Sequence, residues 1–207
     1  MQAKKTYKVG RRLGASVFDK CQTQKFALSE ARHAKHSKSS RKKTTSDFAR
    51  QLLEKQRVRF AYGLTEKQLR LYVEEAKRRS RLSGDAAAEL IGRLEMRADN
   101  TVYRLGLASS RRAARQLVSH GHVMINGVRT TIPSHALREG DTIGFRARTK
   151  SLPIMDRLKK AAEDSASLPR WLSFDIKKFE GTVVACPNAE ATEMPGSVSS
   201  ILEFYSR

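Results

Sequence analysis

The segments that decide the fold class of this chain are SRRAARQLV (residues 110–118) and VMING (residues 123–127). A serine hydroxyl accepts a hydrogen bond from an otherwise unpaired backbone N–H, so we expect Ser109 or Ser110 to cap a helix. Three apolar residues recur at helical spacing and predict a buried stripe: Ala114, Leu117 and Val118. The arginines then face solvent. A guanidinium group suits phosphate oxygens because it is a planar fork of donors with a permanent charge.

The charge around this helix has one sign in the sequence. Residues 93–150 contain eleven Lys and Arg against four Asp and Glu, a net charge of +7, and no acidic residue lies between Asp99 and Glu139. We therefore expect the exposed arginines to have no acidic neighbours that pair with them. Because a one-signed patch concentrates polyanions, the pattern indicates a nucleic-acid surface rather than an ordinary solvated helix face.

The whole chain is strongly basic. Its net charge of +20 again indicates a nucleic-acid partner. Its length of 207 residues is enough for one or two domains. No apolar run approaches the roughly 20 residues that span a bilayer, and the N-terminus lacks the apolar segment of a secretory signal. The two cysteines, Cys21 and Cys186, suggest no disulfide framework. We predict a cytoplasmic protein with no membrane partner.

The distribution of charge predicts four regions. Residues 1–45 carry thirteen basic and two acidic residues with few apolar ones, which predicts an extended basic arm. Residues 46–91 look helical, and residues 92–150 form the arginine-rich RNA-binding module. Residues 151–207 carry a net charge of −1 and predict a linking helix, near residues 155–162, and a C-terminal segment that packs back on the body.

Local signals predict the helices of residues 46–91. TEKQ (residues 65–68) has the form of a capping box, with Leu64 and Leu69 as the hydrophobic staple around it. Two apolar stripes follow: Leu69, Tyr72, Val73 and Ala76, and then Ala87, Leu90, Ile91 and Leu94. The breaks between the helices are predicted at Gly63, Ser83 and Gly84.

The period changes from helical to alternating after the arginine helix. Asn126-Gly127 is a strong hairpin signal, with a return strand expected over residues 128–132. EGD (residues 139–141) predicts another turn, and Ile143 and Phe145 alternate as in a strand. The fold class expected is therefore α+β: a helical domain, a small domain made of a helix pair and an antiparallel sheet, and the extended arm.

Several motifs resemble those of the bacterial small-subunit ribosomal protein S-four family (universal family uS-four). They are RADNTVYRLG (97–106), SR (110–111), ARQLV (114–118) and VMING (123–127), and the similarity extends over residues 46–207. The chain departs from the family mainly near its ends. A Pro-Gly-Gln-His-Gly loop common in the family is missing, and Ala98 stands where leucine is usual.

The resemblance implies a structural constituent of the small ribosomal subunit without a catalytic step or a cofactor. Such a protein is a primary binder of 16S ribosomal RNA that nucleates assembly of the 5′ domain. It lines the messenger RNA entrance, touches the neighbouring proteins S-five and S-three, and contributes to translational accuracy.

We expect recognition mainly through phosphate contacts, because the RNA major groove is too narrow for side chains to read easily. The candidate contacts of the module are Arg93, Arg97, Arg104, Arg111, Arg112 and Arg115, with Gln116, His120 and Asn126 as hydrogen-bonding partners. The candidates in the arm, which we expect to become ordered only on RNA, are Lys4, Lys5, Arg11, Arg12, Lys35, Lys38, Arg41, Lys42 and Lys43. Those in the helical region are Arg50, Lys55 and Arg57. Tyr103 and Phe145 are expected in the core.

The sequence has three alternative interpretations. Cys21, His33 and His36 are only three candidate zinc ligands where a structural site needs four, so no metal is predicted. The rival function is a free RNA-binding factor of stress response or ribosome quality control, which would cycle on and off the ribosome. A basic DNA-binding protein is a poorer third choice, because no helix-turn-helix, zipper or zinc-finger pattern occurs.

Overall fold

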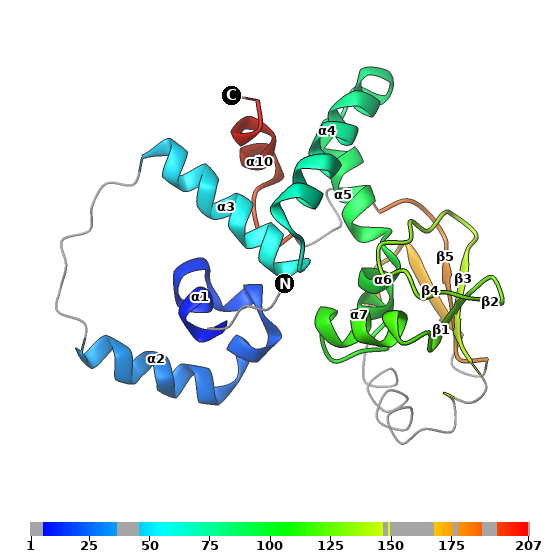
Figure 1. The fold of residues 1–207 in the computed structure, drawn as a ribbon, viewed down its shortest axis with the longest axis horizontal. Coiled ribbons are helices and arrows are strands. Elements are labelled where there is room, and N and C mark those ends of the chain that lie inside the picture. The colour runs from blue at the N-terminus through cyan, green and yellow to red at the C-terminus, as the bar shows by residue number, and fades with distance from the viewer. Residues whose placement is uncertain are drawn as a thin grey trace. The chain divides into compact units, whose positions relative to one another are not determined.

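The structure, a computed structural model, describes residues 6–36, 46–146, 149, 168–175, 178–187 and 194–206. The chain divides into two compact units (Figure 1). The first contains residues 1–78 and 194–207, and the second contains residues 79–193. Helices build the first unit, whereas the second combines helices with an antiparallel sheet, so the α+β class is confirmed. No helix among the described residues is both long and apolar enough to cross a membrane.

The described part of the first unit is helical. Its elements are α1 (Thr6–Leu13), η1 (Ala15–Val17), η2 (Asp19–Gln22), α2 (Gln24–His36), α3 (Asp47–Ala61), the first part of α4 (Glu66–Ser83) and α10 (Val198–Phe204). The predicted capping box starts α4. Thr65 N donates to Gln68 Oε1 at 3.0 Å and Gln68 N donates to Thr65 Oγ1 at 3.2 Å. The predicted stripe lies inward, with Leu69, Val73 and Ala76 fully buried.

Residues 6–36 differ from the extended arm expected from the sequence. Two helices and two 3-10 turns surround four buried side chains: Leu13, Val17, Cys21 and Phe26. The Tyr7 and Phe26 rings meet edge to face at 5.3 Å between centroids. A regular helical or strand period does not describe these buried positions, because a turn separates each from the next. Because this segment has few apolar residues, its small core was not predicted from the sequence.

The C-terminal helix α10 lies against α3 in the first unit. Ser197 caps it by accepting a hydrogen bond from Ser200 N at 3.3 Å. A Cβ at Gly196 would lie 3.2 Å from the Glu54 carbonyl oxygen, so glycine permits the close approach that lets Ser197 N donate to Glu54 Oε2 at 3.0 Å.

Among its described residues, the second unit combines helices with a five-stranded antiparallel sheet. Its elements after α4 are α5 (Ala86–Glu95), α6 (Ala98–Arg104), α7 (Arg111–Ser119), β1 (Val123–Ile125), β2 (Val128–Arg129), β3 (Thr142–Phe145), β4 (Leu172–Asp175) and β5 (Glu180–Val183). The strand order is β2-β1-β3-β5-β4, and all neighbours are antiparallel. The C-terminal region of the sequence therefore supplies two strands to this sheet as well as α10 to the first unit.

The predicted hairpin is present. Ile125 pairs with Val128 across a two-residue turn in which Asn126 and Gly127 have φ of 50° and 76°. The return strand is shorter than expected, ending at Arg129 rather than at residue 132. The turn at residues 139–141 is also confirmed, since Gly140 has a φ of 84° and precedes β3.

Helices α6 and α7 lie beside the sheet (Figure 1), and one apolar core joins them to it. Its members include Val102, Leu105, Leu117, Val118, Val123, Ile143, Trp171, Leu172 and Val183. Gly181 in β5 allows α6 to approach, because a Cβ there would lie 2.5 Å from Leu105 Cδ1. Ile176 and the predicted linking helix near residues 155–162 lie outside the described residues.

Candidate nucleic-acid interface

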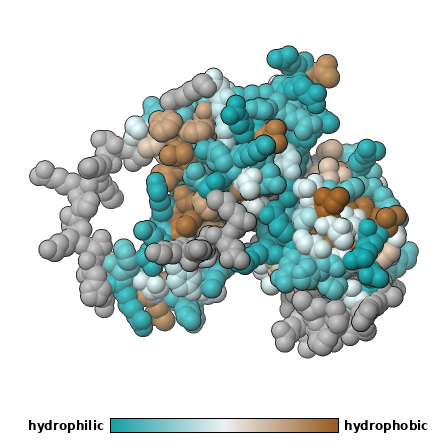
Figure 2. Space-filling view, viewed as in Figure 1, coloured by the Kyte–Doolittle hydropathy of each residue, from teal (hydrophilic) through white to brown (hydrophobic). Residues whose placement is uncertain are grey.

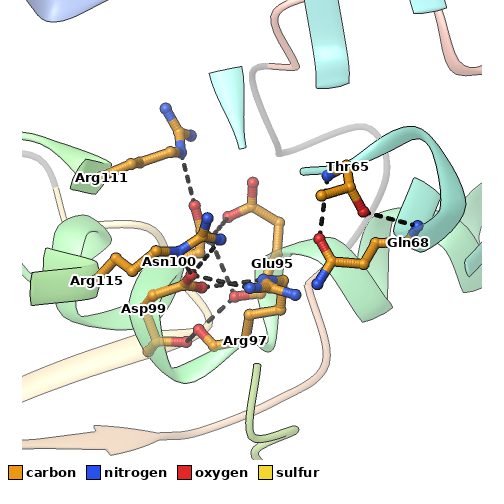
Figure 3. Close-up of polar contacts among 9 residues, drawn as sticks. Thr65, Gln68, Glu95, Arg97, Asp99, Asn100, Arg111 and Arg115 are labelled. Atoms are coloured by element: carbon orange, nitrogen blue, oxygen red, sulfur yellow. Dashed lines mark hydrogen bonds and ion pairs between the residues drawn. The ribbon is translucent and has the colours of Figure 1, made fainter. Parts of the chain in front are cut away.

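Helices α6 and α7 bring arginines together around two buried carboxylates (Figure 3). Ser110 Oγ accepts a hydrogen bond from Ala113 N at 3.1 Å, so the predicted cap starts α7 at Arg111. The predicted stripe is buried, which fixes the face that the arginines of α7 present.

The first carboxylate, Glu95 at the end of α5, is completely buried. Arg104 binds it through two parallel hydrogen bonds of 2.8 Å, from Nε to Oε2 and from Nη2 to Oε1. Asn100 Nδ2 also donates to Glu95 Oε2 at 2.9 Å, while Asn100 Oδ1 accepts from Arg111 Nε at 2.8 Å. The Arg111 guanidinium lies 4.5 Å from the centroid of the Tyr103 ring, in a cation–π contact. Glu95 therefore holds Arg104 directly and Arg111 through Asn100.

The second carboxylate, Asp99 on α6, is shared by two arginines. Arg97, with 3% of its surface exposed, donates from Nε to Asp99 Oδ1 at 3.0 Å and from Nη2 to Oδ2 at 2.9 Å. Arg115 Nε donates to Asp99 Oδ2 at 2.8 Å, and its side chain remains 31% exposed. Asp99 thus links a buried arginine to one that reaches the surface.

The prediction that these arginines have no acidic neighbours is wrong. Glu95 and Asp99 lie outside α7 in the sequence, but the fold places Asp99 against Arg115 of α7 and Glu95 against Arg104 of α6. Four arginines against two carboxylates leave a net charge of +2 within this cluster, to which the exposed Arg112 adds. Because the carboxylates fix the guanidinium groups before any ligand arrives, less side-chain entropy is lost on binding a phosphate.

The remaining candidates of the module have different environments. Arg112 and Gln116 are exposed on α7, His120 is exposed at its C-cap, and Arg93 is half-buried on α5. Arg97 is a correction: its burial against Asp99 makes it part of the scaffold rather than a surface contact.

Asn126 has hydrogen-bond partners within the sheet. Its Nδ2 donates to Asp141 Oδ1 at 2.8 Å, and its Oδ1 accepts from Thr142 N at 2.8 Å. Both ends of the amide therefore join the hairpin turn to the start of β3. The side chain therefore stabilises the sheet, and because Asn126 is exposed, its assignment as an RNA contact stays a prediction.

The candidates on α3 are mostly structural. Lys55 is 5% exposed, with its Nζ 2.6 Å from Glu66 Oε1 and 4.3 Å from the centroid of the Phe204 ring. Arg57 Nε donates to the Leu13 carbonyl at 2.7 Å and so ties α3 to α1. Lys55 is therefore corrected to a helix-joining residue, whereas Arg57, with 38% of its side chain exposed, joins two helices and stays a predicted RNA contact. Arg50 is exposed and pairs with Asp47 at 2.9 Å.

Glu66 and Tyr205 extend the Lys55 contact into a cluster. The Tyr205 hydroxyl donates to Glu66 Oε1 at 2.7 Å. Burial alone raises the pKa of the Glu66 carboxyl, but hydrogen bonds from Lys55 and Tyr205 outweigh it and lower that pKa. Burial, followed by the hydrogen bond to Glu66, raises the pKa of Tyr205. The cluster holds α3, α4 and α10 together.

In the N-terminal region, Arg11 is half-buried and Arg12 is exposed on α1. Lys35 belongs to the last turn of α2. The other candidates of the arm lie outside the described residues: Lys4, Lys5, Lys38, Arg41, Lys42 and Lys43. Cys21 is buried in the small N-terminal core. Within the described ranges, no three His, Cys, Asp or Glu side chains are grouped to hold a metal ion.

Sequence reasoning missed Arg129, an exposed residue of β2. Its guanidinium lies against the turn that ends α7: a Cβ at Gly121 would be 2.3 Å from Arg129 Nε. Gly121 also has a φ of 70°, which favours glycine. The turn therefore brings Arg129 beside the end of α7, next to the exposed His120. No short-range signal relates the hairpin to this turn.

The fold and the arginine face define an RNA-binding module of the S4 type attached to a helical domain. Residues 96–143 match the family model of the S4 domain, and residues 2–95 match that of the ribosomal protein S4/S9 N-terminal domain.

Relatives that match over nearly the whole chain identify the family within this class of RNA-binding proteins. The chain is 40% identical to the small ribosomal subunit protein uS4 of Acetivibrio thermocellus, over 95% of this chain and 94% of the relative. It is 41% identical to that of Roseiflexus sp., over 97% and 96%, and 39% identical to that of Natranaerobius thermophilus, over 95% and 94%. The chain belongs to the uS4 family of small ribosomal subunit proteins.

Proposed function

We propose that this chain is a structural, non-catalytic component of the small ribosomal subunit that binds 16S ribosomal RNA through the arginine face of α6 and α7. The observation that carries the proposal is the pair of buried carboxylates, Glu95 and Asp99, which hold Arg104, Arg111 and Arg115 at the surface of an S4-type domain. Family membership supplies the ribosomal context.

Recognition on this face is by backbone geometry. Fixed guanidinium groups bind phosphate oxygens at defined spacings, and double-helical RNA is read mostly by its shape and backbone. Phe145 is buried in the core and Tyr103 packs beneath Arg111, so neither of these rings provides a platform on which bases stack.

We extend the proposal to the finer roles that the family resemblance implies. The protein binds 16S RNA early and nucleates the 5′ domain, contacts S-five and S-three, and lines the messenger RNA entrance, where it contributes to accuracy. Its support is the similarity over nearly the full length of its relatives. Reconstitution of small-subunit particles without this protein should leave the 5′ domain unprotected from chemical probes. Normal protection would contradict the assembly role.

The experiment that separates this function from a free RNA-binding factor is sedimentation of cell extract after a high-salt wash. We expect the protein to remain with the small-subunit particle at one copy per particle, because a structural component is enclosed by many RNA contacts. Release into the supernatant at sub-stoichiometric amounts would favour the cycling factor.

A further inference from the structure

A groove of about 420 Å³ lies between α1 and α3 in the first unit. Its apolar lining is Val9 and Leu13 from α1 with Leu52, Leu53 and Phe60 from α3. The space-filling view shows hydrophobic surface along this part of α3 (Figure 2). An apolar hollow on the most basic part of the chain is unusual for a surface that only attracts phosphates.

The polar lining of the groove is cationic. Lys8 and Arg12 are exposed residues of α1 at its rim, and Gln56 and Arg59 belong to α3. No acidic residue is among the described residues that line it. The charge of the groove is therefore complementary to an anionic ligand that also has an apolar part.

Two buried polar atoms in this wall have no hydrogen-bond partner among the described residues: Gln56 Oε1 and Arg59 Nε. The far end of the Arg59 guanidinium lies 3.6 Å from Glu66 Oε2, and its plane covers the Phe60 ring at 4.6 Å. Buried polar atoms are normally satisfied, so an acceptor and a donor on successive turns of one helix point to a ligand that carries both a donor and an acceptor.

We propose that this groove accepts one unpaired nucleobase of the bound ribosomal RNA. The apolar side chains hold the faces of the ring, Gln56 and Arg59 bind its edge after a small rotation of their side chains, and the phosphates on either side of the nucleotide lie against Lys8 and Arg12. The inference rests on the proposed binding of ribosomal RNA.

A nucleotide satisfies this lining better than an acidic peptide helix does. A base edge carries donors and acceptors, and its ring is apolar on both faces, while every nucleotide is flanked by anions. The aliphatic side chains with which an amphipathic helix fills a groove would leave Gln56 Oε1 and Arg59 Nε without partners. We therefore commit to RNA as the occupant.

Crosslinking tests the location. The full chain bound to 16S RNA is irradiated at short ultraviolet wavelength and digested with trypsin, which cuts after Arg59 and Lys67 and so isolates Phe60 in a peptide of residues 60–67. Mass spectrometry should find a nucleotide on this peptide. Adducts confined to peptides of α6, α7 and the sheet would overturn the nucleobase site while leaving the proposed function intact.

A thermodynamic cycle tests the base contact. Gln56→Leu keeps the side-chain size and should weaken RNA binding about fivefold through the lost hydrogen bond. Removing the base of the crosslinked nucleotide should weaken RNA binding by the wild-type protein. The same removal should weaken RNA binding by Gln56→Leu by a smaller factor, because the substitution has already deleted the interaction between Gln56 and the base. Independent, multiplicative losses would overturn the proposal. Gln22→Leu, at an exposed position of η2, is the matched control and should bind like the wild type.

The rim cations have a charge-matched control on α2. Lys8→Ala with Arg12→Ala should lower the slope of log affinity against log salt by roughly 1 to 2, since each flanking phosphate releases about one counterion. Lys25→Ala with Arg32→Ala removes the same charge from exposed positions of α2 and should change the slope much less. Equal changes for the two pairs would mean that the rim only adds net charge, and would overturn the flanking-phosphate contacts.

Discussion

The two units use carboxyl-centred clusters for opposite purposes. In the helical unit, Glu66 binds the buried Lys55 and the hydroxyl of Tyr205, so the lysine ammonium joins helices and does not reach the surface. In the S4-type unit, Glu95 and Asp99 hold arginines whose side chains stay 19% exposed at Arg104 and 31% exposed at Arg115. The carboxylates of the second unit therefore position arginines at a surface, whereas the carboxylate of the first unit holds helices together.

The difference follows from the chemistry of the two cations. A lysine ammonium is a compact charge that a carboxylate and aromatic rings can enclose. A guanidinium is a planar fork with five donors, so one edge can bind a buried carboxylate while the group still extends towards solvent. An arginine that is bound to a buried carboxylate thus provides a fixed positive charge at the surface, whereas a lysine that is bound to a carboxylate provides an internal contact.

The largest effect we predict is a loss of stability of the S4-type unit when the buried Glu95 is replaced. Glu95→Ala removes the partner of Arg104 and one partner of Asn100, and leaves buried polar groups unsatisfied, so it should destabilise this unit by about 3–5 kcal/mol. Hydrogen exchange of the α6 and α7 amides in increasing urea measures this loss locally.

Glu74→Ala is the control for that comparison. Glu74 pairs with Arg70 at 2.8 Å, but its side chain is 54% exposed, so its removal should destabilise its own helix, α4, by less than about 1 kcal/mol when the exchange of the α4 amides is measured. Similar losses for the two variants would show that Glu95 is no more important than a surface charge.

The second prediction concerns the turn after α7. Gly121→Ala and Gly127→Ala both place a side chain at positive φ, 70° and 76°, and each should destabilise the S4-type unit by about 1–2 kcal/mol. Only the first displaces a neighbour, since its Cβ would meet the Arg129 guanidinium, whereas nothing lies within 4 Å at Gly127. RNA affinity, measured on folded protein, should therefore fall for Gly121→Ala and stay unchanged for Gly127→Ala. Equal affinities would remove Arg129 from the interface.

The smallest effect is at the helix joint. Tyr205→Phe deletes the hydrogen bond to the half-exposed Glu66 and should destabilise the helical unit by about 1 kcal/mol near neutral pH. The pKa of Tyr205 is raised in the folded protein, so its contribution is fully present below the ordinary tyrosine pKa of about 10 and is lost as the pH rises above it. Thermal unfolding of both proteins from pH 7 to pH 11 should show the difference shrinking above about pH 10. A difference that grows there would contradict the assigned direction of the shift.

Local features of the fold could be predicted from the sequence. The capping box at Thr65, the cap at Ser110 and the turn at Asn126-Gly127 each depend on residues within four positions of one another. Short-range chemistry fixes such structures almost irrespective of what packs against them. The α+β class followed from these elements.

The environments of the charged side chains could not be predicted in the same way. Counting charges along residues 93–150 found no acidic residue within the arginine helix, but the fold places Asp99 against Arg115, sixteen positions later in the sequence. Likewise the burial of Lys55 depends on α10, about 150 residues further along the chain. A side chain's partners in space are set by packing, which no local pattern records, so Arg97 and Lys55 were assigned to the surface when they belong to the interior.

The central claim is that the fixed arginines of α7 contact ribosomal RNA, and the most direct test is the affinity of full-length Arg111→Ala with Arg115→Ala for 16S RNA across a range of salt concentrations. We expect a loss of about 1–3 kcal/mol for each charged hydrogen bond removed, together with a shallower salt dependence. Lys25→Ala with Arg32→Ala, which removes the same charge from α2, should lose much less. Unchanged affinity in the folded α7 variant, or an equal loss in the α2 variant, would contradict the claim.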